Sequence, residues 1–279
     1  DIEDFNGAFV SLMGGDLLHN SEMKMMADWV RGLSHQPNPH QNPDRSFSAA
    51  AQAGKTAFET LPSVDFGGGF TLKCIDCHSE VDGSGPVTVL PIPLTFIGPS
   101  QPTNTPQLRG LYRRGAASIT GAPSKVGFGF SHDGGLPDLR FFLDIPAFSL
   151  TPTAVKDDMA EFLRSFDSGV APAVGRRFRL DATTANGAAF LAEIQLLESR
   201  AITGELDLVA IGQAGGAPLR LYFDPLVGLY VSSRDGSYLT RSSIESLAAL
   251  GGAELVFMAT PPGELQRFAI DVDQDEVPD

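Results

Sequence analysis

Two cysteines stand three residues apart, and a histidine directly follows the second, in the run Cys74-Ile75-Asp76-Cys77-His78. This CxxCH spacing is the attachment motif of a c-type haem. On a helical turn the two thiols share one face and can add to the two vinyl groups of one porphyrin, while the next imidazole reaches the iron. The sequence therefore predicts haem c on Cys74 and Cys77, with His78 as the proximal iron ligand.

Three other uses of a close cysteine pair fit this chain less well. A disulfide closing so short a loop stabilises a fold little, because the entropic gain grows with loop length. A structural zinc site usually takes four Cys or His ligands, and the sequence holds no second Cys pair and no HxxxH spacing. A redox CxxC is expected near a βαβ pattern, which the surrounding sequence does not show.

Composition indicates a folded, exported protein of more than one domain. The chain has 279 residues, 42% of them hydrophobic, and a net charge of −14. Strong negative charge argues against nucleic acid and anionic membranes as partners. No apolar run is long enough for a membrane span. Because the chain begins at Asp1 without methionine, we expect it to be processed or part of a longer precursor.

Helical periodicity dominates the part of the chain around the motif. A stripe of Met23, Met26, Trp29, Val30 and Leu33 predicts a helix from Ser21 whose apolar face meets a core. An alanine-rich helix is expected from Ser48, and a last helix carries Met159 and Phe162. This last helix is expected to pack across the first.

The pattern changes after a Pro-, Gly- and Ala-rich stretch at 167–176, which reads as a linker. Strands alternating with two helices then predict an α+β domain over 177–270. That domain contains no Cys or His, so its default role is docking or self-association. The predicted domains are thus 1–170, 177–270 and an acidic tail at 271–279.

Several segments of residues 1–175 resemble the C-terminal haem domain of bacterial dihaem cytochrome c peroxidases. The matching pieces are DIEDFNGAFVSLMGG, CIDCHS, TPQLRGLY, GFGFSHDGG and the final helix with FDSG. The resemblance implies a multidomain fold, in which an all-α cytochrome c-like domain precedes a smaller α+β domain. It also implies that Arg109 and His132 lie near the haem, and that attachment occurs outside the bacterial cytoplasm.

The sixth iron ligand departs from the pattern of that family. Where the related peroxidase domains carry a methionine, this chain reads Asp144-Ile145-Pro146-Ala147-Phe148. Three options follow: His132 is the distal ligand, Met159 or an N-terminal methionine replaces it, or the iron is five-coordinate. His132 is ranked first, and a hydrogen bond from His132 to a propionate is its alternative.

The acidic tail is a candidate calcium site. Asp271, Asp273, Asp275 and Asp279 resemble the aspartate-rich calcium repeats of extracellular proteins and have the spacing of oxygen ligands on one loop. Glu276 replaces the glycine of the sharp turn, and no acid follows at the twelfth position. The alternative is a solvated acidic tail.

Three functions compete on this evidence. The first is an exported, periplasmic or extracellular one-electron carrier that exchanges electrons with redox partner proteins. The second is a peroxidase-like haem enzyme, which needs an open iron position and a nearby acid–base group such as His132. The third is a haem-bearing structural or interaction module. The single CxxCH motif favours the carrier, since the related peroxidases use two haems.

Overall fold

The structure, a computed structural model, describes residues 2–65, 71–78, 83, 105–115, 127–131 and 134–271. This chain divides into two compact units, Asp1–His35 and Gln36–Asp279. The calls that rest on His132, Asp273, Asp275 and Asp279 lie outside the described residues.

The first unit holds three short helical elements: η1 (Glu3–Phe5), α1 (Asn6–Ser11) and α2 (Asn20–Arg31). The side chain of His19 caps α2, accepting from the backbone N–H of Ser21. Of the predicted stripe, Met23 is buried, whereas Trp29 is 68% exposed. A stripe predicts that a helix has an apolar face but not what covers that face.

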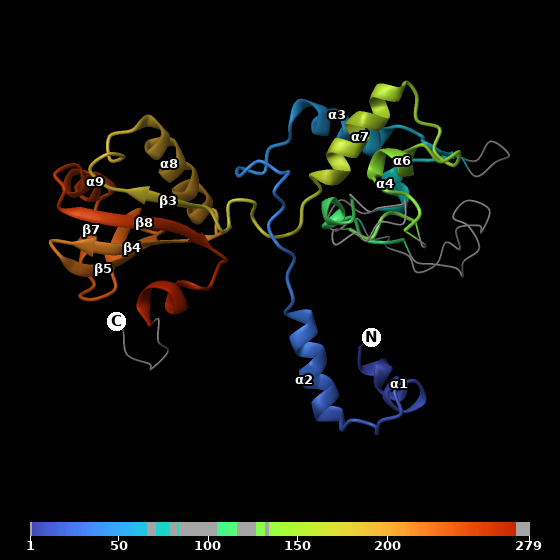
Figure 1. Cartoon of the computed structure of the whole chain (residues 1–279), viewed down its shortest axis with the longest axis horizontal. Helices are drawn as coiled ribbons and strands as arrows, with labels where there is room; N and C mark the ends of the chain where they lie inside the picture. The colour runs from blue at the N-terminus through green and yellow to red at the C-terminus, as the bar shows by residue number, and fades with distance from the viewer. Residues whose placement is uncertain are drawn as a thin grey trace. The chain divides into compact units, whose positions relative to one another are not determined.

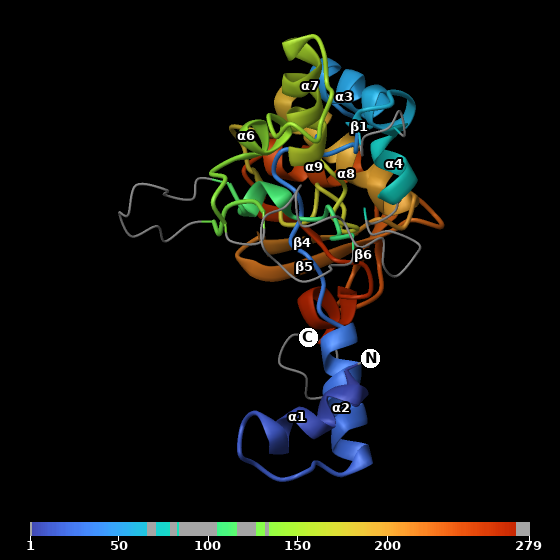
Figure 2. The same ribbon diagram turned by 90° about the vertical axis from the view of Figure 1, so that its right-hand side faces the viewer.

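The second unit begins with the elements that surround the cysteine motif. They are α3 (Ala49–Thr60), β1 (Val64–Asp65), β2 (Thr71–Leu72), α4 (Cys74–Cys77), η2 (Leu111–Arg113), α6 (Leu139–Leu143) and α7 (Thr153–Arg164). Ser48 caps α3 by accepting from the Ala51 N–H. Figures 1 and 2 both show α3 alongside α7.

Gly54 sets the close approach of these two helices. A methyl group on Gly54 would overlap the carbonyl oxygen of Asp158 and lie 2.9 Å from the backbone nitrogen of Met159. Glycine thus allows the two backbones to touch. The helix that packs across α7 is therefore α3, and not the predicted helix at the start of the chain.

A hydrophobic core forms around this crossing. Its buried members are Ala51, Phe58, Leu108, Leu111, Phe130, Leu139, Leu143, Leu150, Met159, Ala160, Phe162, Leu163 and Phe166. Cys74 and Ile75 pack against the same core from its edge. The core therefore supports the cysteine turn directly.

The remainder of the second unit is built on a six-stranded antiparallel sheet of order β3-β8-β4-β5-β6-β7. Its elements are β3 (Arg177–Leu180), α8 (Ala188–Ile202), β4 (Asp207–Ala214), β5 (Ala217–Asp224), β6 (Leu229–Ser232), β7 (Tyr238–Leu239), α9 (Arg241–Ala249), β8 (Ala253–Thr260) and η3 (Gln266–Ile270). Alternation along the strands turns Leu208, Leu221 and Leu255 to one face, where all three are buried. Figure 1 shows α8 and α9 covering one side of the sheet.

The predicted fold class, an all-α cytochrome c-like domain followed by a smaller α+β domain, is wrong. A two-stranded antiparallel pair, with Val64 opposite Leu72, lies directly before the cysteine turn. Phe148 also bridges to Val64, so a third segment joins this pair. The sheet that follows has six strands and is a main element of the structure. Two-residue strands have no measurable period, which is why periodicity indicated helices alone.

Among the described residues, no helix combines the length and apolarity that crossing a membrane requires.

Candidate cofactor-attachment site

The cysteine motif forms one helical turn, α4. The carboxylate of Asp76 accepts from the backbone N–H of Lys73 at 2.9 Å and holds the start of the turn. At its end, the N–H of His78 donates to the carbonyl of Cys74, also at 2.9 Å. Residues three apart on a helix are neighbours on its surface, so Cys74 and Cys77 share one side of the turn.

Both cysteines are free thiols. Burial raises the pKa of each, although a contact of 3.3 Å with the hydroxyl of Ser63 opposes the effect at Cys74. The thiolate is the form that binds metals and exchanges disulfides. A raised pKa keeps both groups in the thiol form, which disfavours a zinc site and a redox pair.

The ring of His78 is oriented by the backbone. Its Nδ1 lies 2.5 Å from the carbonyl oxygen of Gly83, and because a carbonyl can only accept, Nδ1 carries the proton. Burial lowers the pKa of His78, although hydrogen bonds with the backbone at Gly83 and Pro106 oppose this shift. The imidazole is therefore neutral, and its Nε2 keeps a lone pair for a metal ion. Metal-binding histidines usually have such a second hydrogen bond.

Gly83 is required for this geometry. Its φ is 72°, and a side chain there would overlap Leu108, whose backbone nitrogen would lie 2.6 Å from the added methyl group. Only glycine reaches this conformation readily and fits the space. The sequence analysis did not single out Gly83, and its separation from His78 by four residues in a proline-rich stretch gave no signal.

Arg109 directly follows Leu108, so the structure brings it to the same part of the fold as the His78 contact. Its Nε is buried and has no hydrogen-bond partner among the residues that the structure describes. Gly169, at φ 85°, leaves room beside the guanidinium. A buried guanidinium nitrogen without a partner is costly, and carboxylates are its preferred partners. Arg109 is therefore positioned to bind an anionic group.

Met159 lies in the middle of the α3–α7 core and is fully buried. Its neighbour across the crossing is the backbone of Gly54. For its sulfur to serve as a ligand elsewhere, the side chain would have to leave this core.

Calcium binding by the tail stays a prediction. Asp271 is described and is buried at 5% exposure. The three other predicted ligands lie in 272–279, beyond the described residues. Within the described ranges, no group of three or more His, Cys, Asp or Glu side chains is placed to hold a metal ion.

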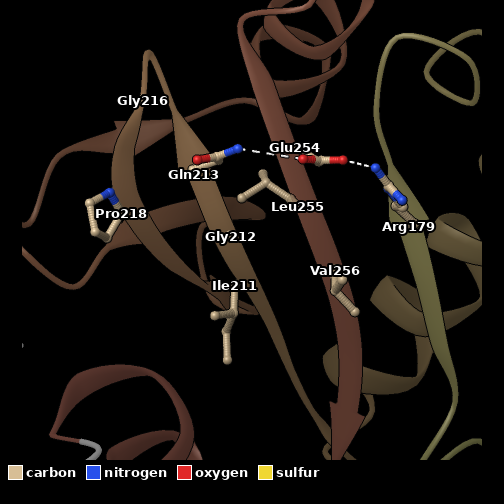
Figure 3. A pocket seen from close by; sticks show the side chains of 9 residues that line it. All are labelled: Arg179, Ile211, Gly212, Gln213, Gly216, Pro218, Glu254, Leu255 and Val256. Carbon is tan, nitrogen blue, oxygen red and sulfur yellow. Dashed lines mark hydrogen bonds and ion pairs between the residues drawn. The ribbon is translucent and has the colours of Figure 1, made fainter.

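A pocket of about 520 Å³ lies on the sheet, far along the chain from the cysteine turn. Figure 3 shows its floor, which includes Ile211 and Val256, and its polar rim. In the rim, Arg179 pairs with Glu254, and the amide of Gln213 donates to Glu254 at 3.5 Å. Because these polar groups satisfy one another, the pocket offers no reactive or unpaired side chain for chemistry.

No protein-family model matches the chain, and neither the curated proteins nor the solved structures contain a significant match to it. The predicted resemblance to the haem domain of dihaem cytochrome c peroxidases is therefore wrong: no family supports it, and the structure, with its two sheets, is not an all-α cytochrome c domain. What remains is the geometry of the site itself, namely two thiols on one turn, a neutral imidazole and an unpaired guanidinium nitrogen.

Proposed function

We propose that this chain carries one haem, attached covalently through Cys74 and Cys77 with His78 as an axial ligand, and serves one-electron transfer. The observation that carries the proposal is the hydrogen bond from His78 Nδ1 to the Gly83 carbonyl, next to two free thiols on one turn. Bound haem iron supplies reversible one-electron chemistry. The residues of this chain supply attachment, ligand orientation and charge.

Each residue of the site fits one part of the group. The thiols of Cys74 and Cys77 match the two vinyl substituents, because both lie on the same side of α4. Arg109 matches a propionate, since its buried Nε has no partner in the described part of the chain. His78 presents Nε2 as a neutral donor, and its lowered pKa extends the pH range in which a proton does not compete with iron.

The setting follows from the same chemistry. Covalent haem attachment is expected in an exported protein, which places this chain in the periplasm or outside the cell. With a net charge of −14, the chain attracts basic redox partner proteins at long range, and this attraction weakens with salt. The six-stranded sheet part offers a surface for docking or self-association.

Replacing His78 by alanine tests the ligand assignment. We expect His78→Ala to keep the two thioether bonds but to lose the low-spin absorption spectrum, because the iron loses its proximal imidazole. The measurement is the absorption spectrum of the exported protein in both oxidation states. His40→Ala is the matched control, because His40 carries no role at this site. Identical spectra for wild type and His78→Ala would contradict the assignment.

Replacing Met159 by leucine separates core packing from ligation. We expect Met159→Leu to leave the absorption spectrum unchanged and to lower the free energy of unfolding by less than about 1.5 kcal/mol, as volume-conserving core changes do. A change of spin state in this variant would instead show that the Met159 sulfur binds iron. Chemical denaturation followed together with the spectrum distinguishes the two results.

A further inference from the structure

Phe128 is a large apolar side chain held out from the surface, with 84% of it exposed. A single exposed apolar residue is ordinary in a protein surface. Phe128 differs because the backbone on both sides of it is fixed. Its exposure is therefore built into the chain and is not a result of a loose segment.

Glycines on each side of Phe128 fix this backbone. Gly127, at φ 78°, lies so close to the preceding segment that an added methyl group would be 2.7 Å from the carbonyl oxygen of Arg114. Gly129, at φ 70°, would meet the carbonyl oxygen of Leu136 at 2.9 Å. Positive φ and contact on both sides leave these positions to glycine.

Arg114 ties the same segment to the rest of the fold. Its carbonyl accepts from the Gly129 N–H at 2.9 Å, and its Nε donates to the Gly129 carbonyl at 3.1 Å. Phe130, two residues after Phe128, lies under the Arg114 guanidinium and exchanges backbone hydrogen bonds with Leu136. Phe128 is thus the exposed residue of a clamped turn.

This turn is continuous with the cysteine site. Phe130 belongs to the same core as Leu108 and Leu111, and Cys74 packs on that core. Leu108 in turn contacts Gly83, the acceptor for His78. One set of packed residues therefore connects the His78 contact with the turn that presents Phe128.

We propose that Phe128 packs on the attached haem and shields it from water. This inference rests on the proposed function, since it names a positioning residue for the same site. The haem is the occupant that fits best because it is a flat, largely apolar group attached at the edge of the core that holds Phe130. Aromatic side chains pair well with such a surface. The rigid turn sets the ring in place before the haem arrives, so little entropy is lost on contact.

The test uses the haem-bearing protein, with Phe128→Ala compared with Phe128→Leu and with Phe141→Ala. Phe141 is the matched control because it is also an exposed phenylalanine, at 54%, and lies on α6. NMR of the reduced protein reports whether the Phe128 ring protons show nuclear Overhauser contacts to the haem and a porphyrin ring-current shift. The reduction potential reports haem exposure, since water and a higher dielectric favour the ferric charge.

We expect contacts between the Phe128 ring and the haem, and a potential that falls in Phe128→Ala, recovers in Phe128→Leu and is unchanged in Phe141→Ala. Haem present with neither contacts nor a shift in potential overturns the inference while leaving the proposed function intact. A variant that slows electron exchange with a basic redox protein but keeps the wild-type potential assigns Phe128 to partner docking, which also overturns it. Wild-type protein that never acquires haem overturns both proposals together.

Discussion

Double substitution of Cys74 and Cys77 by alanine abolishes covalent haem attachment when the chain is exported in cells with an active haem c attachment system. Each thiol supplies one thioether bond, so each single variant keeps one bond and the double variant keeps none. The measurement is the intact mass, together with haem staining after denaturing electrophoresis. The wild type is expected to gain the mass of one haem.

Ser63→Ala is the matched control for this experiment. Ser63 is fully buried and its hydroxyl lies 3.3 Å from the Cys74 sulfur, so this variant changes the surroundings of the thiol but leaves both thiols in place. We expect haem attachment in Ser63→Ala to match the wild type. Wild-type protein without added mass, from cells in which a reference cytochrome is fully loaded, would reject haem attachment altogether.

The second large effect is expected at the crossing of α3 and α7. Placing a methyl group at Gly54 would overlap the Asp158 carbonyl, so Gly54→Ala must push the two helices apart. Overpacking of this kind costs typically 1–3 kcal/mol, and we expect a loss of about 3 kcal/mol here because the obstacle is backbone and cannot rotate away. The free energy of unfolding from urea titration measures this loss.

Helix propensity alone predicts the opposite sign. Alanine is favoured over glycine inside a helix by about 1 kcal/mol. Gly7 in α1 has nothing within 4 Å of an added methyl group, so Gly7→Ala is the matched control and should be neutral or stabilising. If Gly54→Ala were as well tolerated as Gly7→Ala, the close backbone contact between α3 and α7 would be refuted.

Sequence reasoning predicted the local chemistry well, because the attachment motif is contiguous. Helical periodicity also located α3 and α8, and alternation with turn residues located β4 and β5. These features are set by neighbours along the chain. The corresponding parts of the structure therefore follow from short windows of sequence.

Features that depend on distant residues could not be predicted in this way. The pairing of Val64 with Leu72 involves strands too short to show a period. The buried side chain of Asn38 lies in a stretch that reads as a solvent-facing loop, yet its amide donates to the carbonyls of Arg164 and Phe166. A polar residue reveals a buried role only when its partners are known.

The same limit applies to the site. CxxCH named three residues, but Gly83, which orients His78, acts through a backbone carbonyl that no side-chain pattern encodes. Arg109 was selected through a family resemblance that proved wrong, and it is retained for a different reason, its buried and unpaired Nε. The residues that bear the chemistry were thus readable from the sequence, whereas those that orient them were not.

The separation along the chain between Gly54 and Asp158 has a consequence for the order of maturation. Their contact closes a long loop, and such distant contacts form slowly because the chain must first lose much of its conformational freedom. Cys74, Cys77 and His78 lie within five consecutive residues and need no such closure. Attachment can therefore precede folding, so that the newly anchored haem acts as a nucleus on which α3 and α7 later assemble.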